Sequence, residues 1–225
     1  MLSILPKVTC RRLKWIYLCG VNATLAQQFE IIADGLADQG IAIVDQFLTP
    51  EEATAIASLD GFSKALLQFK KAGIGKLSDK TINESIRGDY IEWIDKNLAP
   101  PALHVYLARL DQLMQYVNQT LFLSLQDYEL HQTVYPVGAF YKRHLDQFKK
   151  DDRRKLSVIC YLNANWQPEQ GGQLRVYSDG DTLDVLPEAG RLVCFRSDLL
   201  EHEVLPALRE RISITGWMLD RPAWQ

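Results

Sequence analysis

The chain has 225 residues, of which 47% are hydrophobic and 24% are charged, as is typical of a soluble globular protein. Its net charge of -3 argues against a broad electrostatic surface for nucleic acid or for an acidic membrane, so we expect neither partner. The four cysteines have no CxxC spacing and do not suggest a disulfide framework, which makes a reducing cytoplasm the expected location.

The N-terminal segment loosely imitates a signal peptide. Basic residues at 11–14 precede an apolar run at 15–21, but that run is short, interrupted and placed late. We therefore interpret residues 1–24 as an N-terminal extension and residues 25–225 as a single domain. No segment approaches the length needed to span a membrane.

The first half of this domain, residues 25–126, has helical patterning. Apolar residues recur at helical spacing from Leu25 to Leu36, Gly40 ends that helix, and residues 41–44 form a short buried strand. Residues 49–52 carry the sequence of a helix start, with Thr49 as the cap and Glu52 completing a capping box. A longer helix opens at residues 100–101, and its apolar stripe predicts a packing face.

Beyond residue 126 the pattern changes to short strands separated by turn signals. We predict strands near residues 128–135, 139–146, 155–163, 173–178, 182–186, 191–196, 202–205 and 211–219. This pattern predicts a mainly β fold with N-terminal helices: a double-stranded β-helix, or cupin-like jelly roll, over residues 127–221.

The last strand has one polar and one apolar face. Arg211, Ser213, Thr215 and Trp217 alternate with the apolar residues Ile212, Ile214 and Met218. The polar face either meets solvent or lines a cavity, and a tryptophan at its end fits a cavity better.

The candidate metal ligands are His144, Asp146 and His202. Two imidazoles and one carboxylate hold non-haem Fe(II) on one face and leave coordination positions open. A strand would place residues 144 and 146 on the same side. Arg211 adds a planar donor fork suited to a carboxylate. Taken singly, His144 and Arg211 could each be ordinary surface residues; His104 and His131 appear structural or exposed in the pattern and are weak ligand candidates.

With these motifs in view, the chain resembles the Fe(II)/2-oxoglutarate-dependent prolyl 4-hydroxylases, in particular the hypoxia-inducible-factor type and its bacterial homologues. The resemblance spans roughly residues 28–221. The matching segments are residues 86–94, which contain Arg-Gly-Asp and Trp-Ile, and residues 135–136, 141–146, 160–163, 171–175, 202–204 and 211–217.

The resemblance implies a role for each matching residue. It assigns iron to His144, Asp146 and His202, and the far carboxylate of 2-oxoglutarate to Arg211 and Tyr161. It also lines the co-substrate pocket with Tyr135, Leu174, Thr215 and Trp217. A substrate loop is implied near residues 70–88, with Gly73 and Gly75 supplying flexibility. Arg87 and Asp89 are expected to pin its base, and Trp93 follows in the same matching segment.

The implied activity is a dioxygenase that uses Fe(II), 2-oxoglutarate and O2, with ascorbate as a candidate reductant. It would hydroxylate a prolyl residue of a protein and release succinate and carbon dioxide, and an oxygen-responsive role is an implication of the family alone. Two alternatives stay open: an oxygenase acting on another amino acid or small molecule, and a non-catalytic metal-binding jelly-roll module. The charged segment 147–155 and the short turn at 137–138 depart from the family pattern near the entrance, so they leave the substrate in doubt more than the chemistry.

Overall fold

The computed structural model describes residues 17–18, 23–59, 62, 70–72, 85–148, 151–178 and 180–222. Most of the predicted N-terminal extension, with Cys10 and Cys19, lies outside these residues. The same holds for Gly73, Gly75 and most of the predicted substrate loop. Of the described helices, none is long and apolar enough to cross a membrane.

The helices begin and end where local chemistry favours it. Helix α1, Leu25–Gln39, starts at a capping box made by Thr24 and ends at Gly40, whose φ of 74° is easy only for glycine. Both its start at Leu25 and its end at Gly40 are as predicted. Helix α2, Pro50–Ala57, has the predicted capping box between Thr49 and Glu52. Helix α5, Pro101–Leu121, opens with proline in its first turn, where no backbone donor is needed.

The strands form two sheets. The larger has the order β1-β2-β10-β7-β12-β5-β4-β3 and the smaller the order β6-β11-β8-β9. Every neighbouring pair is antiparallel except β1 with β2. Their bounds are β1 Tyr17–Leu18, β2 Ile41–Val44, β3 Lys70–Lys71, β4 Tyr90–Trp93, β5 Asp127–Tyr135, β6 Tyr141–His144, β7 Arg154–Tyr161, β8 Leu174–Ser178, β9 Asp181–Val185, β10 Leu192–Arg196, β11 His202–Val204 and β12 Arg211–Leu219. Short 3-10 helices occupy Lys96–Leu98 and Pro168–Gln170.

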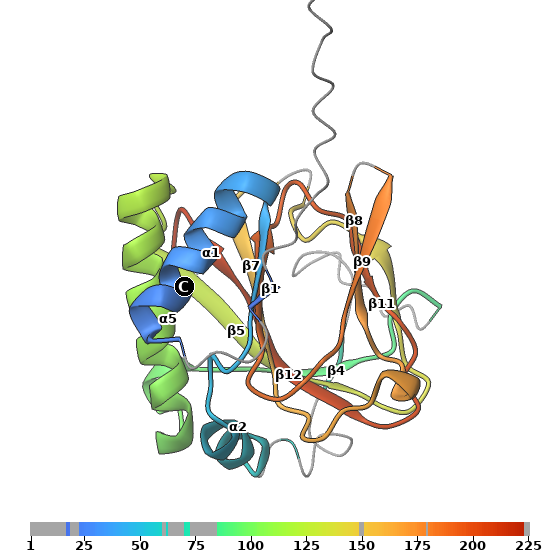
Figure 1. Ribbon diagram of the computed structural model, residues 1–225. Coiled ribbons are helices and arrows are strands. Elements are labelled where there is room, and N and C mark those ends of the chain that lie inside the picture. Colours follow the sequence, from blue (N-terminus) through green and yellow to red (C-terminus); the bar gives the residue numbers. More distant parts are fainter. Residues whose placement is uncertain are drawn as a thin grey trace, which may run out of the picture.

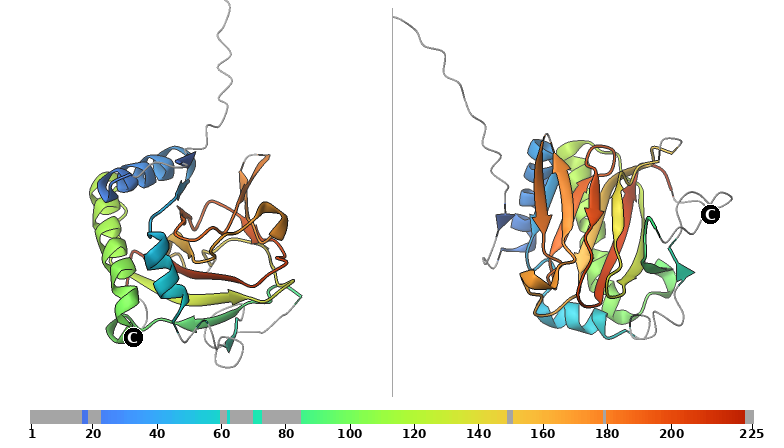
Figure 2. Two further views of the ribbon diagram at one scale, coloured as in Figure 1. Left: turned by 60° about the horizontal axis from the view of Figure 1, so that its bottom comes forward. Right: turned by 90° about the vertical axis from the view of Figure 1, so that its right-hand side faces the viewer.

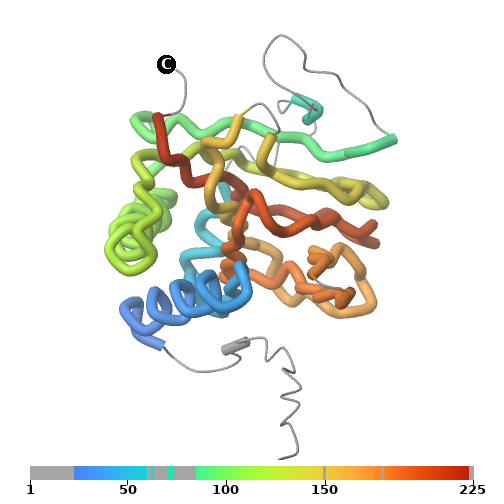
Figure 3. Tube along the Cα trace, turned by 90° about the horizontal axis from the view of Figure 1, so that it is seen from above, coloured from blue at the N-terminus to red at the C-terminus, as the bar shows by residue number. Residues whose placement is uncertain are grey.

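The molecule is built in three layers: helices, large sheet, small sheet (Figure 1). Helices α1 and α5 cover one face of the large sheet, as the view along another axis also shows (Figure 3). The small sheet lies over the opposite face, in front of the helices in the right-hand view of Figure 2.

Alternation along the central strands divides the interior into two apolar clusters. On β7, Leu156, Val158 and Cys160 belong to the cluster shared with the helices. Ile159 and Tyr161 point the other way, into the space between the sheets. Because successive side chains of a strand face opposite sides, one sequence serves both cores. The predicted stripe on α5 packs against the first cluster, with Leu103, Leu110 and Val117 among its buried residues.

The predicted jelly roll is confirmed. Strands β5 to β12 correspond one by one to the eight predicted segments, and β12 has the predicted bounds. Three short strands were not predicted, β1, β3 and β4; the last of them pairs with β5 and carries Trp93. Two predicted strands extend two residues too far: β6 ends at His144, before Asp146, and β7 ends at Tyr161.

Candidate active site

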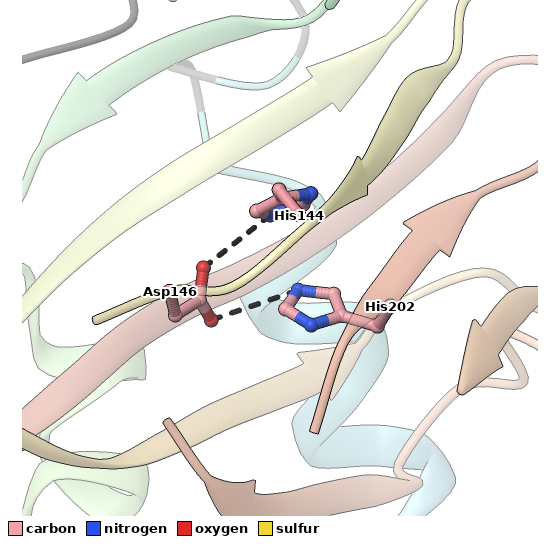
Figure 4. Close-up of side chains that lie close together, drawn as sticks. All are labelled: His144, Asp146 and His202. Atoms are coloured by element: carbon pink, nitrogen blue, oxygen red, sulfur yellow. Dashed lines mark ion pairs between the residues drawn. The ribbon is translucent and has the colours of Figure 1, made fainter. Parts of the chain in front are cut away.

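Three side chains converge between the two sheets (Figure 4). His144 ends β6, His202 begins β11, and Asp146 lies in the segment that follows β6. One donor atom from each lies within 4.8 Å of the other two. The Asp146 carboxylate points to both rings, with 3.4 Å from Oδ1 to His144 Nε2 and 3.7 Å from Oδ2 to His202 Nε2.

Both imidazoles are held in the same way. The Nδ1 atom of His144 lies 2.8 Å from the Lys142 carbonyl oxygen, and that of His202 lies 3.2 Å from the Leu200 carbonyl oxygen. A carbonyl can only accept, so Nδ1 carries the proton and Nε2 presents its lone pair. Carbonyl partners of this kind orient histidines that bind metals.

The charges at the site suit a divalent metal. Burial alone would raise the pKa of Asp146, but His202, His144 and the Ser157 hydroxyl together hold that pKa well below its ordinary value. Burial lowers the pKa of His202 to about 4, against the opposing attraction of Asp146, so its imidazole is neutral at pH 7. One ionised carboxylate with two neutral imidazoles is the donor set of non-haem Fe(II) sites, and the residues therefore fit this ion.

Arg211, the first residue of β12, lies in the same inter-sheet space and is 1% exposed. Its Nε donates to the Gly172 carbonyl oxygen at 2.9 Å, and its guanidinium lies about 5 Å from the ring centres of Tyr135 and Tyr161, at 5.0 and 4.9 Å. Gly172 has a φ of 71°, and a Cβ there would lie 2.9 Å from the Ala207 Cβ and 3.0 Å from the Trp166 ring. Position 172, whose carbonyl holds Arg211, therefore favours glycine.

Two polar atoms around Arg211 are buried without a partner among the described residues: its own Nη2 and the Tyr161 hydroxyl. A buried donor left unpaired costs about 1–3 kcal/mol, so such pairs call for a ligand that accepts hydrogen bonds. A carboxylate meets this need, because its negative charge complements the guanidinium and its two oxygens can accept from Nη2 and from the Tyr161 hydroxyl. The predicted polar face of β12 is thus buried at Arg211 and Ser213, and the solvent-exposed alternative is wrong for these two residues.

The remaining pocket residues separate into two groups. Leu174 and Tyr135 pack with Tyr161 in the inter-sheet cluster beside Arg211. Thr215 is half-buried and its hydroxyl lies 3.1 Å from that of Ser213. Trp217 lies further along β12, with 5.5 Å between its ring centre and that of His131 and 6.3 Å to that of Trp93.

The Arg-Gly-Asp segment is tied to the metal centre through one aromatic ring. Arg87 and Asp89 form a two-bond ion pair at 2.8 and 2.5 Å, with Asp89 only 1% exposed. The Arg87 guanidinium lies 4.3 Å from the centre of the Tyr141 ring, which stacks on His144 at 3.6 Å. Trp93 is half exposed on β4. The predicted pinning of this segment by Arg87 and Asp89 therefore has a physical counterpart.

Several residues near the site were not predicted from the sequence. Ser157 and Ser197 are fully buried beside Asp146. Arg154, in the charged segment 147–155, lies 3.4 Å from the centre of the Trp217 ring and pairs with Glu129. Of the two histidines expected to be structural or exposed, His131 is buried and His104 is exposed. Alternation along β5 would have placed His131 on the same face as Tyr135.

Comparison with known proteins agrees with this geometry. The sequence model of the 2OG-Fe(II) oxygenase superfamily matches residues 130–219. Human Egl nine homolog 1 is 32% identical over 205 residues, which is 85% of this chain and 46% of that protein. A hypoxia-inducible factor prolyl hydroxylase of Caenorhabditis elegans is 30% identical over 85% of this chain and 28% of its own length. The chain thus spans less than half of each of these two curated relatives.

Solved structures extend the comparison to the fold. A Pseudomonas putida prolyl-4-hydroxylase has 45% sequence identity and a TM-score of 0.77, covering 86% of this chain and all of that one. A prolyl hydroxylase from Trichoplax adhaerens, solved with a hypoxia-inducible factor peptide fragment, has 27% identity and a TM-score of 0.75, covering 87% and 90%. The chain therefore belongs to the 2OG-Fe(II) oxygenase superfamily, in its prolyl hydroxylase family.

Proposed function

We propose that this protein is an Fe(II)- and 2-oxoglutarate-dependent dioxygenase that hydroxylates a prolyl residue of a protein. One observation carries the proposal: the His144, Asp146 and His202 donors cluster between the two sheets, where a buried arginine, Arg211, has an Nη2 without a partner among the described residues. Two imidazoles and a carboxylate leave coordination positions open for a co-substrate and oxygen. The arginine supplies the charge that a second carboxylate of that co-substrate needs.

In this proposal the site residues bind the metal and the co-substrate and hold them in position. His144, Asp146 and His202 hold iron, and the backbone carbonyls at Lys142 and Leu200 fix the rings. Iron with bound 2-oxoglutarate would supply the oxidising chemistry, in which O2 converts the co-substrate to succinate and carbon dioxide and one oxygen atom enters a C–H bond of the substrate. The protein supplies orientation and excludes water.

The far carboxylate of 2-oxoglutarate would lie between Arg211 and Tyr161. The orphaned Nη2 and hydroxyl would each gain an acceptor there, and burial makes these charge-assisted bonds strong. Tyr135 and Leu174 form apolar walls beside the guanidinium. Thr215 and Trp217 continue the same face of β12.

A protein substrate would approach from the side of β4. Arg87, Asp89 and Trp93 lie there, and Tyr141 links the Arg-Gly-Asp segment to His144. The similarity to the C. elegans hypoxia-inducible factor prolyl hydroxylase and to the Trichoplax enzyme solved with a peptide fragment supports a polypeptide substrate. An oxygen-responsive role, ascorbate as reductant, a cytoplasmic location and the division into an N-terminal extension and one oxygenase domain remain predictions.

The test is to measure products with purified protein. Anaerobic addition of Fe(II) and 2-oxoglutarate should give a charge-transfer absorption band, and its absence would favour the non-catalytic metal-binding module. Succinate should then form in proportion to a prolyl peptide, with mass spectrometry showing one added oxygen on proline. Turnover of a free amino acid or another small molecule, without turnover of prolyl peptides, would favour the alternative oxygenase.

A further inference from the structure

We propose that Ser157 and Ser197 form a positioning pair that fixes the Asp146 carboxylate, reserving Oδ2 for a hydrogen bond and Oδ1 for the metal. This inference rests on the iron site proposed above. It assigns a role to two buried hydroxyl groups that the site has not used so far.

The two serines form a hydrogen-bonded chain to the carboxylate. Ser157 Oγ lies 2.6 Å from Asp146 Oδ2, and Ser197 Oγ lies 2.9 Å from Ser157 Oγ. Both serines are 0% exposed and Asp146 is 8% exposed. Water therefore does not reach these hydroxyls, and each must find its partner within the protein.

The direction of this chain follows from chemistry. An ionised carboxylate only accepts, so Ser157 must donate its single hydroxyl proton to Oδ2. Ser157 then has only lone pairs to offer to Ser197, which makes Ser197 the donor of the second bond. Ser197 thus acts on the carboxylate through Ser157, and it fixes the rotamer from which Ser157 donates.

Asp146 needs such positioning because it lies outside the regular strand. Strand β6 ends at His144, so the pleat that orients His144 does not orient the carboxylate. Ser157, by contrast, lies in β7, between β10 and β12 in the large sheet. Ser197 is held at both backbone groups, since its N–H donates to Lys155 and its carbonyl accepts from the Gln147 N–H at 3.1 Å. The residue after Asp146 is thus tied to the same serine.

The two carboxylate oxygens are consequently not equivalent. Oδ2 accepts a short bond from Ser157 and lies 3.7 Å from His202 Nε2, while Oδ1 is the oxygen nearer to His144, 3.4 Å from its Nε2. Without the serine bond the carboxyl group could rotate and offer both oxygens to the ion. A two-oxygen ligand would fill a coordination position that the co-substrate or oxygen requires. The serine pair would keep that position open.

Metal binding, measured without turnover, tests this role. The dissociation constant for Fe(II) would be determined anaerobically for wild type, Ser157→Ala, Ser197→Ala and the double variant, and visible absorption would be recorded with Co(II). We expect Ser157→Ala to weaken Fe(II) binding about 10- to 100-fold, the usual effect of losing a partner of a metal ligand, and to alter the Co(II) bands. Ser197→Ala should weaken binding less, and should add nothing once Ser157 is alanine.

Two further variants control for packing. Cys160→Ala removes one atom from the opposite face of the same strand and should leave the Fe(II) constant and the Co(II) bands unchanged. Ser157→Thr keeps a hydroxyl and should restore most of the affinity. Unfolding of the metal-free variants, followed by circular dichroism, reports whether each one folds. If Ser157→Ala does not fold, Ser197→Ala with Ser157→Thr carries the test.

The outcomes separate this inference from the proposed function. Wild-type protein that binds no Fe(II) would overturn the function. Wild-type binding with an unchanged constant and spectrum in folded Ser157→Ala, or additive effects of the two serines, would overturn the positioning role alone. If Ser197→Ala replaces Ser157→Ala, an unchanged constant in Ser197→Ala would do the same.

Discussion

His144 and His202 face each other directly across two neighbouring strands. They are register partners in the antiparallel pair of β6 and β11, and their ring centres lie 4.3 Å apart. Backbone pairing thus fixes the distance between two candidate ligands that are far apart in the sequence. Because the carboxylate comes from the segment after β6, it depends on other contacts, above all those with Ser157.

Loss of one imidazole should abolish metal binding and turnover. His202→Ala removes a donor that is 3% exposed and leaves only two of three protein ligands. We expect no Fe(II)-dependent succinate above the background of metal-free protein, measured by mass spectrometry. His104→Ala, at an exposed position of α5, is the matched control and should retain full activity. Turnover that persists in His202→Ala would remove this histidine from the ligand set.

Arg211→Lys should raise the 2-oxoglutarate requirement. Lysine keeps the charge but cannot reproduce the planar fork that bonds Gly172 and leaves Nη2 free for a ligand. Losing one bond to a charged group costs about 1.5–3 kcal/mol. The KM for 2-oxoglutarate should therefore rise roughly 10- to 100-fold, with a similar melting temperature. An unchanged KM would show that another cation holds the co-substrate.

Asp89→Ala should destabilise the fold markedly. The carboxyl group is 1% exposed and is bonded twice by Arg87, so its removal leaves a largely buried guanidinium without its carboxylate partner. Breaking such a buried pair typically costs about 3–5 kcal/mol in unfolding free energy. Asp184→Ala breaks the exposed Arg175 pair instead and should cost less than about 1 kcal/mol. Denaturant unfolding of both variants gives the comparison, and equal effects would contradict the role of burial.

His131 should make stability depend on pH. Burial, assisted by the charge of Arg87, lowers the pKa of His131 from 6.5 to about 3. Below pH 6.5 the His131 imidazole is protonated in the unfolded chain but stays neutral in the folded protein. The free energy of unfolding therefore falls as the pH drops from 6.5 toward 3. The loss attributable to this residue is roughly 1 kcal/mol per pH unit.

A His131→Gln variant isolates this effect. Glutamine does not titrate and can still bond Thr133, whose hydroxyl lies 2.7 Å from His131 Nδ1. Denaturant unfolding of metal-free protein at pH 7 and pH 5 should show a smaller loss of stability for the variant than for wild type. Equal losses would mean that His131 is protonated in the folded protein.

Much of the fold could be read from the sequence because its causes are local. The Thr49 and Glu52 capping box, the stop at Gly40 and the alternation of β12 each depend on residues close together in the chain. Strand β4 was not predicted because it is stabilised by pairing with β5, which lies far from it in the sequence.

The sequence by itself determined the residue types of the site and the eight-strand pattern that brings them together. It did not determine whether the polar face of β12 meets solvent or is buried, because alternation predicts two faces but not what covers each of them. Only the tertiary structure decided that Arg211 is buried with an unpaired nitrogen, and that His131 is buried beside Trp217. It alone brought Ser157 and Ser197 to Asp146, since hydrogen bonds between distant strands depend on register, which leaves no local pattern in the chain.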